Sequence, residues 1–353
     1  MLPDYSINLL RILDANSNRA REGIRTAEDY VRFSVNDSRW AARLKAIRAC
    51  ISKLLSACVG DQLTSGRDVA GDPGSAEKSG LEPTKAQEPP REVARRGLKR
   101  AQEALRVLEE YLRGWRPIEA TELSKQRYVL YEAEQWLVHA SEAAATLNSA
   151  QLYVLLSPQQ CPQGLMKTAE AVLKGGARLL QLRAKSDLDD VAHCAQASDL
   201  LTLCKNCGAV LICNDRVDVA LASGAQGVHL GQQDLHPVDV RKIAGERLLL
   251  GRSTHSVEQA RQAAESGQVD YIAVGAIYET STKPGRILAG PALAEQVSAL
   301  NVSVPVYAIG GITLARIPEL KSVGMRRVAL ASAITAADNP EEMTRRFVDA
   351  LVL

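Results

Sequence analysis

At 353 residues the chain is long enough for two domains, and 46% hydrophobic residues is ordinary for a globular protein. Its 43 Lys and Arg nearly balance 41 Asp and Glu, so the net charge of +2 gives no sign of a nucleic-acid or membrane-surface partner. We expect neither a signal peptide nor a membrane span, because no apolar run is suitable for either. Seven scattered cysteines favour a reducing compartment, so we expect a cytoplasmic protein.

The first third of the chain is predicted to be helical and contains an internal repeat. Residues 19–32 match residues 100–113 position by position. Apolar residues at spacing i, i+3, i+7 recur in both copies, which predicts a stripe that faces a core. The residues of this stripe are Ile24, Ala27 and Val31 in the first copy and Leu105, Leu108 and Leu112 in the second.

The two copies also share three charged positions. Opposite charges three residues apart on a helix form surface ion pairs, and this is the interpretation that we prefer. The alternative is a two-fold-symmetric site for an anionic ligand, although the sequence does not identify that ligand. The repeated pairs are Glu22 with Glu103, Arg25 with Arg106, and Glu28 with Glu109.

Two further segments complete the predicted N-terminal domain, residues 1–147. Residues 65–92 contain four Gly and four Pro without apolar periodicity, which predicts a long loop. Residues 118–148 contain neither Gly nor Pro, so we predict one long helix that packs against the repeat helices and leads into the second domain. No motif in this domain indicates its role.

From residue 151 onwards, short apolar runs alternate with amphipathic segments. Eight such β/α units in roughly 200 residues is the number in a compact (β/α)₈ barrel. We therefore predict an α/β protein with a C-terminal (β/α)₈ TIM barrel, residues 148–353, after an all-α N-terminal domain. A doubly wound open sheet is the alternative, but the segment after the first strand is not a Gly-rich loop. The candidate strands are Leu152–Leu156, Arg178–Leu182, Val210–Cys213, Gly227–Leu230, Leu248–Gly251, Tyr271–Val274, Val306–Ile309 and Arg327–Leu330.

Two aspartates follow neighbouring strands of the predicted barrel. Asp215 follows the third strand and Asp234 the fourth, and a short helix from Arg216 to Ala222, closed by Gly224, connects them. In such a βαβ unit both strand ends point the same way, so the two carboxylates should share one rim. Carboxylates facing open space are typical of a Mg²⁺ site that water and substrate phosphate complete. Locally, Asp215 could instead cap the helix and Asp234 could begin a turn.

The other predicted strand ends carry amides, cations, hydroxyls and glycines. Alternation places Gln181, Arg183 and Lys185 on one side of the chain. Barrels commonly bind a phosphate after strands 7 and 8, here Gly310–Gly311 and Ala331–Ser332. The full set suits a metal-bound pyrophosphate together with a separate monophosphate. The remaining candidates are Asn214, Ser253, His255, Thr280, Ser281, Thr282 and Lys283.

Cys204 and Cys207 form a C-x-x-C pattern at the end of a predicted helix. No second cysteine pair or histidine cluster accompanies them. We therefore interpret them as buried thiols, with a zinc site or a redox pair as the alternative.

The motifs after the strands resemble those of thiamine-phosphate synthase, also called thiamine-phosphate pyrophosphorylase, over about residues 151–350. The resemblance implies a (β/α)₈ transferase of an alkyl or aryl group. It joins a hydroxymethylpyrimidine diphosphate to a carboxythiazole phosphate and releases pyrophosphate and CO₂. The N-terminal domain resembles an extension of this enzyme in cyanobacteria and related bacteria. The matching motifs are Gln181-x-Arg183-x-Lys185, Asn214-Asp215-Arg216, Val228-His229-Leu230-Gly231-Gln232-x-Asp234, Gly251-x-Ser253-x-His255, Thr280-x-Thr282-Lys283, Gly310-Gly311-Ile312 and Ala331-Ser332.

The resemblance also implies a role for each matching residue. Asp215 and Asp234 would bind Mg²⁺, while Lys283, Ser253 and Arg183 would act in catalysis. The implied partners are two small-molecule substrates, with no nucleic acid and no membrane, and a homo-oligomer is compatible with the sequence. The pyrimidine diphosphate would contact Gln181, Leu182, Arg183, Ala184, Lys185, Asn214, Ser253 and Lys283. The thiazole phosphate would contact Thr280, Ser281, Thr282, Gly311, Ala331 and Ser332.

The implied chemistry fits a site rich in charge. An aminopyrimidine stabilises the cation that remains when the diphosphate leaves, so a dissociative displacement needs no protein nucleophile. We expect His229 to face the barrel wall or to support other site residues, and the sequence does not decide whether His255 contacts substrate.

Two alternative functions remain. A thiazole tautomerase relative would be an isomerase without a metal or a diphosphate pocket, which the charged residues of the rim argue against. A non-catalytic thiamine-phosphate-binding protein would be expected to have lost one of those charged residues, and all are present.

Overall fold

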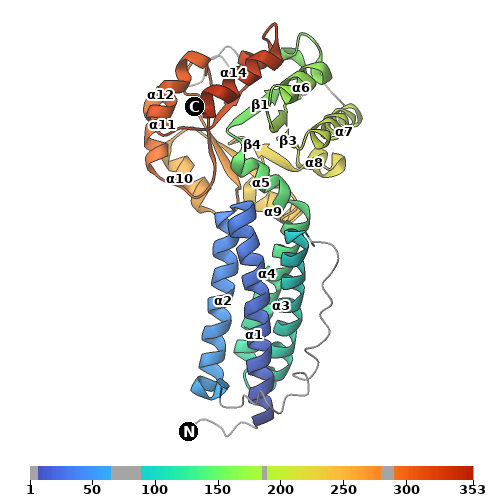
Figure 1. Ribbon diagram of the computed structural model, residues 1–353, viewed down its shortest axis with the longest axis vertical. Coiled ribbons are helices and arrows are strands. Elements are labelled where there is room, and N and C mark those ends of the chain that lie inside the picture. Colours follow the sequence, from blue (N-terminus) through green and yellow to red (C-terminus); the bar gives the residue numbers. More distant parts are fainter. Residues whose placement is uncertain (1–6, 65–88, 185–188, 280–289, 353) are drawn as a thin grey trace. The chain divides into compact units, whose positions relative to one another are not determined.

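The structure is a computed structural model that describes residues 7–64, 89–184, 189–279 and 290–352 (Figure 1). It divides into two compact units, Met1–Val138 and His139–Leu353. Helix α5 (Ser141–Ser149) therefore belongs to the second unit, whereas the boundary expected from the sequence, after residue 147, would have divided it. Within the described residues, no helix is both long and apolar enough to cross a membrane.

Long helices that lie side by side make up the N-terminal unit (Figure 1). The stripe predicted from the repeat is buried, with Ile24, Ala27, Leu105 and Leu108 fully inaccessible, so that prediction is confirmed. A contact between two tilted rings adds to this core, since the centroids of Trp40 and Trp136 lie 5.5 Å apart with an interplanar angle of 31°. The elements of this unit are α1 (Ile7–Tyr30), the π-helical turn η1 (Val31–Val35), α2 (Ser38–Val59), the 3-10 turn η2 (Gly60–Thr64), α3 (Pro90–Leu112) and α4 (Pro117–His139).

Two glycines allow α1 and α3 to approach each other closely. A Cβ atom on Gly97 would lie 2.6 Å from the carbonyl oxygen of Gly23, and a Cβ on Gly23 would overlap the backbone of Gly97. A glycine inside a helix costs about 1 kcal/mol relative to alanine. The close contact between the two backbones explains why glycine is present at both positions.

The repeated charges connect neighbouring helices as well as turns of one helix. Glu28 of α1 pairs with Arg48 of α2 at 2.8 Å, and Glu109 of α3 pairs with Arg127 of α4 at 3.1 Å. Both carboxylates are buried. Arg106 makes the expected pair with Glu109 along α3 at 2.9 Å. Ion pairing along the helix is thus confirmed for the second copy, but Glu109 is buried and not on the surface as predicted. The bridges between helices were not foreseen, and the anionic-ligand alternative stays a prediction.

The long helix predicted over residues 118–148 is wrong in one respect. Ala140 has φ −120° and ψ −17°, outside the helical range, so α4 ends at His139 and α5 begins at Ser141. Of the predicted loop over residues 65–92, residues 65–88 lie outside the described ranges. Helix α3 already begins at Pro90, because proline is favourable in the first helical position.

Eight parallel strands close into a barrel in chain order, with β1 pairing to both β2 and β8. The predicted (β/α)₈ barrel is therefore confirmed and the open sheet is wrong. The strands are β1 (Leu152–Leu156), β2 (Leu179–Leu182), β3 (Val210–Asn214), β4 (Gly227–Leu230), β5 (Leu249–Thr254), β6 (Tyr271–Val274), β7 (Val306–Ile309) and β8 (Val328–Leu330).

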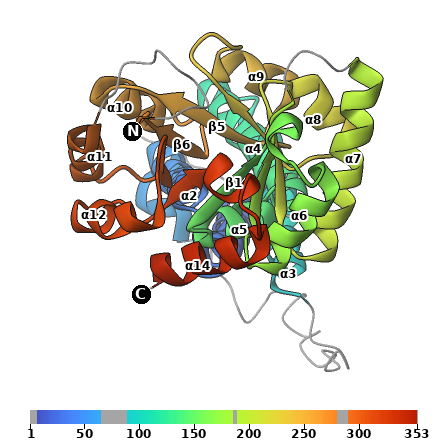
Figure 2. The same ribbon diagram turned by 90° about the horizontal axis from the view of Figure 1, so that it is seen from above.

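Helices surround the strands as an outer ring (Figure 2). Most connect one strand to the next, as the alternating sequence pattern predicts. They are α6 (Leu165–Lys174), α7 (Asp190–Asn206), α8 (Val217–Ser223), α9 (Pro237–Ala244), α10 (Val257–Glu265), α11 (Gly290–Ala299), α12 (Ile317–Ser322), α13 (Ser332–Thr335) and α14 (Pro340–Val352), with the 3-10 turns η4 (Pro158–Gln160) and η5 (Leu314–Arg316).

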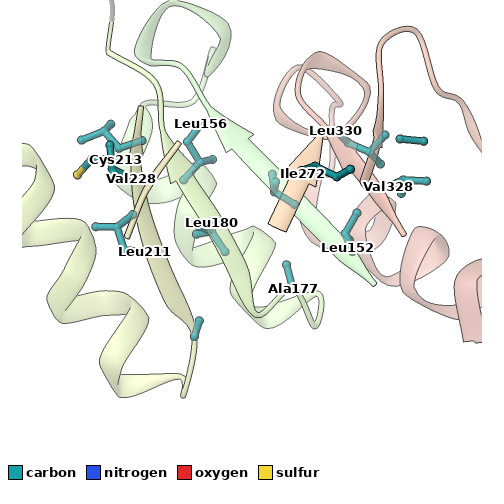
Figure 3. Close-up of a cluster of buried hydrophobic side chains, with 14 of the residues drawn as sticks. Leu152, Leu156, Ala177, Leu180, Leu211, Cys213, Val228, Ile272, Val328 and Leu330 are labelled. Atoms are coloured by element: carbon teal, nitrogen blue, oxygen red, sulfur yellow. The ribbon is translucent and has the colours of Figure 1, made fainter. Parts of the chain in front are cut away.

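Alternation along each strand produces two buried layers. Leu156, Leu180, Leu211, Cys213 and Val228 belong to a hydrophobic cluster with side chains of the surrounding helices (Figure 3). The residues between them point into the barrel, where most are also buried, whereas Asn214 and Ser253 near the strand ends are half-buried. Several of these inward positions are polar, and they extend through the barrel interior to the carboxyl ends of the strands. The inward polar residues are Tyr153, Gln181, Asn214, His229, Ser253, Tyr271 and Tyr307.

Helix α5 is tied to the barrel by hydrogen bonds from two strand residues. Tyr307 Oη donates to the carbonyl oxygens of Leu147 and Ala150, at 3.1 and 2.9 Å. Arg327 Nη2 donates to the carbonyl oxygen of Asn148 at 2.8 Å. These bonds satisfy the last carbonyls of α5, so this helix is an integral part of the barrel unit.

Candidate active site

Two adjoining cavities open at the carboxyl ends of the barrel strands. The acidic cavity, about 550 Å³, is lined by Asp215 and Asp234. The glycine-lined cavity, about 150 Å³, is lined by Gly310 and Gly311. Most of the described strand-end positions predicted from the sequence therefore meet around two cavities that share part of their lining. Residues that line both cavities include Arg183, Asn214, His229, Ser253 and His255.

The backbone around the acidic cavity holds both aspartates in defined positions. Asp215 has φ +62°, a left-handed conformation that aspartate tolerates better than most residues, and its amide donates to the carbonyl oxygen of His229 at 2.8 Å. One carboxylate oxygen of Asp215 accepts a hydrogen bond from Asn214 Nδ2 at 2.5 Å. Asp234 accepts one from the amide of Gly231 at 2.6 Å.

These contacts bear on the local alternatives for the two aspartates. The cap position of α8 is occupied by Arg216, without a side-chain cap bond, so Asp215 is not the N-cap of that helix. Asp234 does close a turn, through its bond to Gly231, yet it also lines the cavity. A turn role and a ligand role are therefore compatible at Asp234.

Alternation along and beyond β2 places an amide and a cation at the cavities, as predicted. Gln181 lines the glycine-lined cavity and Arg183 lines both. Leu182 differs, because its side chain is buried in the hydrophobic layer between strands and helices and it lines neither cavity. Ala184 is described but does not line either cavity. Lys185 and residues 280–283, which include the predicted Thr280, Ser281, Thr282 and Lys283, lie outside the described residues.

Backbone segments approach each other closely where β7 ends, beside the glycine-lined cavity. Gly310 and Gly311 have φ of +104° and +61°, and a Cβ atom on Gly310 would lie 2.7 Å from Cβ of Ala276. The carbonyl oxygen of Gly311 accepts a hydrogen bond from Arg316. Glycine is required here because the backbone adopts left-handed angles and other backbone lies close by. Ala331 and Ser332, at the start of α13, also line this cavity.

Sequence reasoning missed a group of tyrosines inside the barrel. Tyr153, Tyr271 and Tyr307 are fully buried and contact one another edge to face, with ring centroids 5.5–5.8 Å apart. The available signal was that each occupies an inward position of its strand. His229, predicted to face the barrel wall or to support other site residues, is buried and lies 3.1 Å from Tyr271 Oη and 2.9 Å from Ser253 Oγ.

Two other residues singled out by the motifs, His255 and Cys204, have clear surroundings. His255 Nδ1 lies 2.5 Å from the carbonyl oxygen of Gly275, whose peptide bond to Ala276 is cis, and the ring lines both cavities. Cys204 is a free, buried thiol, and burial raises its pKa to about 12, so it is a poor metal ligand or nucleophile. Its neighbour Cys207 is also free and is half-buried. Within the described ranges, no group of three His, Cys, Asp or Glu residues could hold a metal ion.

Comparison with known proteins identifies the family. A family model described as thiamine monophosphate synthase matches residues 152–334, which is the barrel. A thiamine-phosphate synthase of Nostoc punctiforme is 40% identical over 347 residues, covering 97% of this chain and 93% of the relative. One of Gloeobacter violaceus is 38% identical over 345 residues, covering 97% of each chain. The chain belongs to the thiamine-phosphate synthase family.

Membership of the thiamine-phosphate synthase family makes the chain a transferase of thiamine biosynthesis. A solved structure of thiamine phosphate pyrophosphorylase from Pyrococcus furiosus is 27% identical, with a TM-score of 0.53, and covers 58% of this chain and 96% of that one. The ThiD2 family model matches residues 11–136, within the helical unit. The resemblance carried by the strand-end motifs is therefore confirmed. The relatives from cyanobacteria match over both units.

Proposed function

We propose that the chain condenses 4-amino-2-methyl-5-(diphosphooxymethyl)pyrimidine with carboxythiazole phosphate to give thiamine phosphate, pyrophosphate and CO₂. The observation that carries this proposal is the pair of adjoining cavities with different chemistry. Asp215 and Asp234 line one, Gly311 and Ser332 line the other, and Arg183 lines both. The first cavity suits a metal-bound diphosphate, and the second suits a monophosphate on backbone amides.

The donor set of the first cavity supports Mg²⁺ as the cofactor. Asp215 and Asp234 extend from the ends of the paired strands β3 and β4 into one cavity, and both offer hard oxygen donors. Mg²⁺ commonly uses one or two carboxylates and completes its six ligands with water and substrate phosphate. When bound there, it would neutralise charge that develops on the departing diphosphate.

The other residues would position the substrates and stabilise the leaving group. Arg183 would contact the diphosphate, whose departure is favoured by positive charge placed where negative charge develops. Ser253 lines both cavities and would donate its hydroxyl hydrogen to a diphosphate oxygen. The aminopyrimidine would stabilise the cation that remains, which the thiazole nitrogen then attacks. A covalent enzyme intermediate is not required by this route.

The decisive assay is Mg²⁺-dependent release of pyrophosphate from the two purified substrates, with thiamine phosphate identified by mass spectrometry. An isomerase would instead convert the thiazole phosphate alone, without a metal or the diphosphate. A binding protein would bind thiamine phosphate in calorimetry without turnover. Either result in place of pyrophosphate release would overturn the proposal.

We expect residues 139–353 to fold and to form thiamine phosphate without the helical unit. All eight strands and the described residues that line both cavities belong to this unit, and a closed barrel needs no strand from outside. The steady-state constants of this fragment, compared with those of the full chain, test the expectation. A monodisperse, folded fragment without activity would show that residues 1–138 contribute to the site.

A second fragment serves as the control for the boundary. A chain starting at Asn148 keeps every cavity residue but removes Leu147, whose carbonyl oxygen accepts from Tyr307, and the buried Ala143 and Ala144. We expect this shorter fragment to be active but less stable than 139–353. Equal melting temperatures of the two fragments would show that α5 does not stabilise the barrel.

A further inference from the structure

Five polar side chains form a continuous chain of hydrogen bonds across the barrel interior. Gln181 Nε2 lies 2.6 Å from Tyr153 Oη, which lies 2.9 Å from Tyr271 Oη. Tyr271 Oη lies 3.1 Å from His229 Nδ1, and His229 Nε2 lies 2.9 Å from Ser253 Oγ. Both ends of this interior relay, Gln181 and Ser253, line the glycine-lined cavity. The relay therefore connects two parts of the site through the body of the barrel.

Packing holds the interior relay in place. Gln181 is 1% exposed, and Tyr271 is fully buried. Gly251 leaves the space that the relay fills, since a Cβ atom there would lie 2.5 Å from His229 Nδ1 and overlap the Tyr271 ring. Burial raises the pKa of the hydroxyls of Tyr153 and Tyr271, so both keep their hydrogen at neutral pH. Each tyrosine is then one donor and one acceptor.

A chain of such groups has two directions of donation. If Gln181 Nε2 donates to Tyr153 Oη, the Tyr153 hydroxyl must donate its own hydrogen to Tyr271 Oη. Tyr271 then donates to Nδ1 of a neutral His229, whose Nε2–H donates to Ser253. Ser253 keeps its own hydrogen for a ligand, while Gln181 keeps Oε1 as an acceptor. In the opposite direction, Gln181 would offer a donor and Ser253 an acceptor, so the two ends always differ in character.

The orientation of the Gln181 amide corresponds to the first direction, and the relay can reverse if this amide rotates and the hydroxyl and imidazole hydrogens shift with it. Gln181 Nε2 donates to Tyr153, and Gln181 Oε1 is buried without a hydrogen-bond partner among the described residues. An unpaired buried acceptor costs free energy, so its natural complement is a donor on a ligand. In this direction His229 Nε2 carries the hydrogen, and the imidazole cannot take the proton of Ser253. The Ser253–His229 pair is therefore not an activated nucleophile.

The ligand side selects the same direction. A diphosphate offers only acceptor oxygens, so Ser253 must donate to it, and the relay then makes Gln181 Oε1 an acceptor. The exocyclic amino group of the aminopyrimidine is a donor that satisfies Oε1. A pyrimidine with a carbonyl group in place of the amino group would place an acceptor oxygen against Gln181 Oε1, which is itself an acceptor, and would therefore bind less well.

We infer that the interior relay couples the two halves of one substrate: a diphosphate at Ser253 makes Gln181 select an amino group on the pyrimidine. This inference rests on the proposed function and deepens it to a specificity mechanism. Tyr153, Tyr271 and His229 act through Gln181 and Ser253, so they are positioning residues. Recognition of the pyrimidine at Gln181 then depends on the diphosphate that binds at Ser253, the other end of the relay.

The test is a binding experiment on the full chain with defined probes. The ligands are 4-amino-5-hydroxymethyl-2-methylpyrimidine and its 4-oxo analogue, each titrated by calorimetry with and without saturating inorganic pyrophosphate and Mg²⁺. The measured quantity is the ratio of the two dissociation constants. Tyr271→Phe breaks the relay in the middle. Tyr307→Phe is the matched control. It removes a hydroxyl from the same tyrosine cluster, but that hydroxyl bonds to Leu147 and Ala150 and is not part of the relay.

In the unmodified chain, pyrophosphate should increase the preference for the amino compound about fivefold or more, within the usual range of coupling between two sites. Tyr307→Phe should keep this increase, and Tyr271→Phe should abolish it. Tyr153→Phe breaks the relay at another bond and should behave like Tyr271→Phe, which provides a second variant if the first does not fold. A purely structural defect would weaken both ligands without changing the effect of pyrophosphate.

Three results would overturn the inference. The first is an unmodified chain in which pyrophosphate does not change the preference. The second is a preference change that survives in Tyr271→Phe or Tyr153→Phe, which would mean that the two ligands contact each other directly. The third is loss of the preference change in Tyr307→Phe. Thiamine phosphate formation by the unmodified chain is measured separately. If that turnover is absent, the proposed function fails. If turnover is present while the coupling test fails, the relay inference alone is wrong.

Discussion

Replacing Asp215 or Asp234 by asparagine should lower turnover by at least ~10²-fold in each case, the effect usually seen when stabilisation of developing charge is lost. Both carboxylates line the acidic cavity from neighbouring strand ends. Asparagine keeps the size and one hydrogen-bond acceptor, so the bond from the amide of Gly231 to residue 234 survives. The loss would therefore report the missing charge and weaker Mg²⁺ binding. Initial rates at increasing Mg²⁺ concentration measure both effects.

Asp218→Asn is the matched control for this prediction. Asp218 lies in the first turn of α8, is 66% exposed and pairs with Arg216 at 2.6 Å, but it lines neither cavity. Its substitution should leave turnover within about twofold, since exposed ion pairs contribute little. Near-normal activity of Asp215→Asn or Asp234→Asn, with unchanged Mg²⁺ dependence, would contradict the metal assignment.

Replacing Arg241 by leucine is expected to lower the free energy of unfolding of the barrel by about 3–5 kcal/mol, the usual result of removing one partner of a buried ion pair. Arg241 pairs with Asp270 at 2.7 Å and with Glu246 at 3.3 Å, and all three side chains are at most 10% exposed. The guanidinium also donates to the carbonyl oxygens of Gly245, Leu248 and Gln268. Leucine replaces none of these bonds.

The probe for this measurement must report on the barrel. Trp40, Trp115 and Trp136 all lie in the N-terminal unit, so tryptophan fluorescence follows the wrong part of the chain. Hydrogen exchange of β5 and β6 is suitable, because the amide of Leu250 donates to Asp270. Arg345→Leu, on the exposed side of α14, is the control and should cost at most ~1 kcal/mol. Equal losses for the two variants would contradict the prediction.

The sequence by itself determined the architecture and the predicted cofactor site. The eight strands were visible because each is a short apolar run bounded by turn residues, and several of the predicted runs match the strands residue for residue. Asp215 and Asp234 could be placed together because parallel strands joined by a helix must end at the same rim. Such inferences need only the spacing of apolar residues along the chain and the handedness of the connections between strands.

Tertiary structure decided the features that depend on contacts between distant residues. The buried ion pairs of Glu28 and Glu109 depend on which helices lie side by side. No local pattern distinguishes the break at Ala140 from a continuous helix, or these buried carboxylates from surface charges. The interior relay joins residues of β2, β1, β6, β4 and β5, which meet only when the barrel closes. Alternation could show that Tyr153 and Tyr271 point inward, but their hydrogen bond depends on the relative heights of β1 and β6, two strands that do not pair with each other. Those heights are set by strand pairing around the whole ring, which local sequence does not encode.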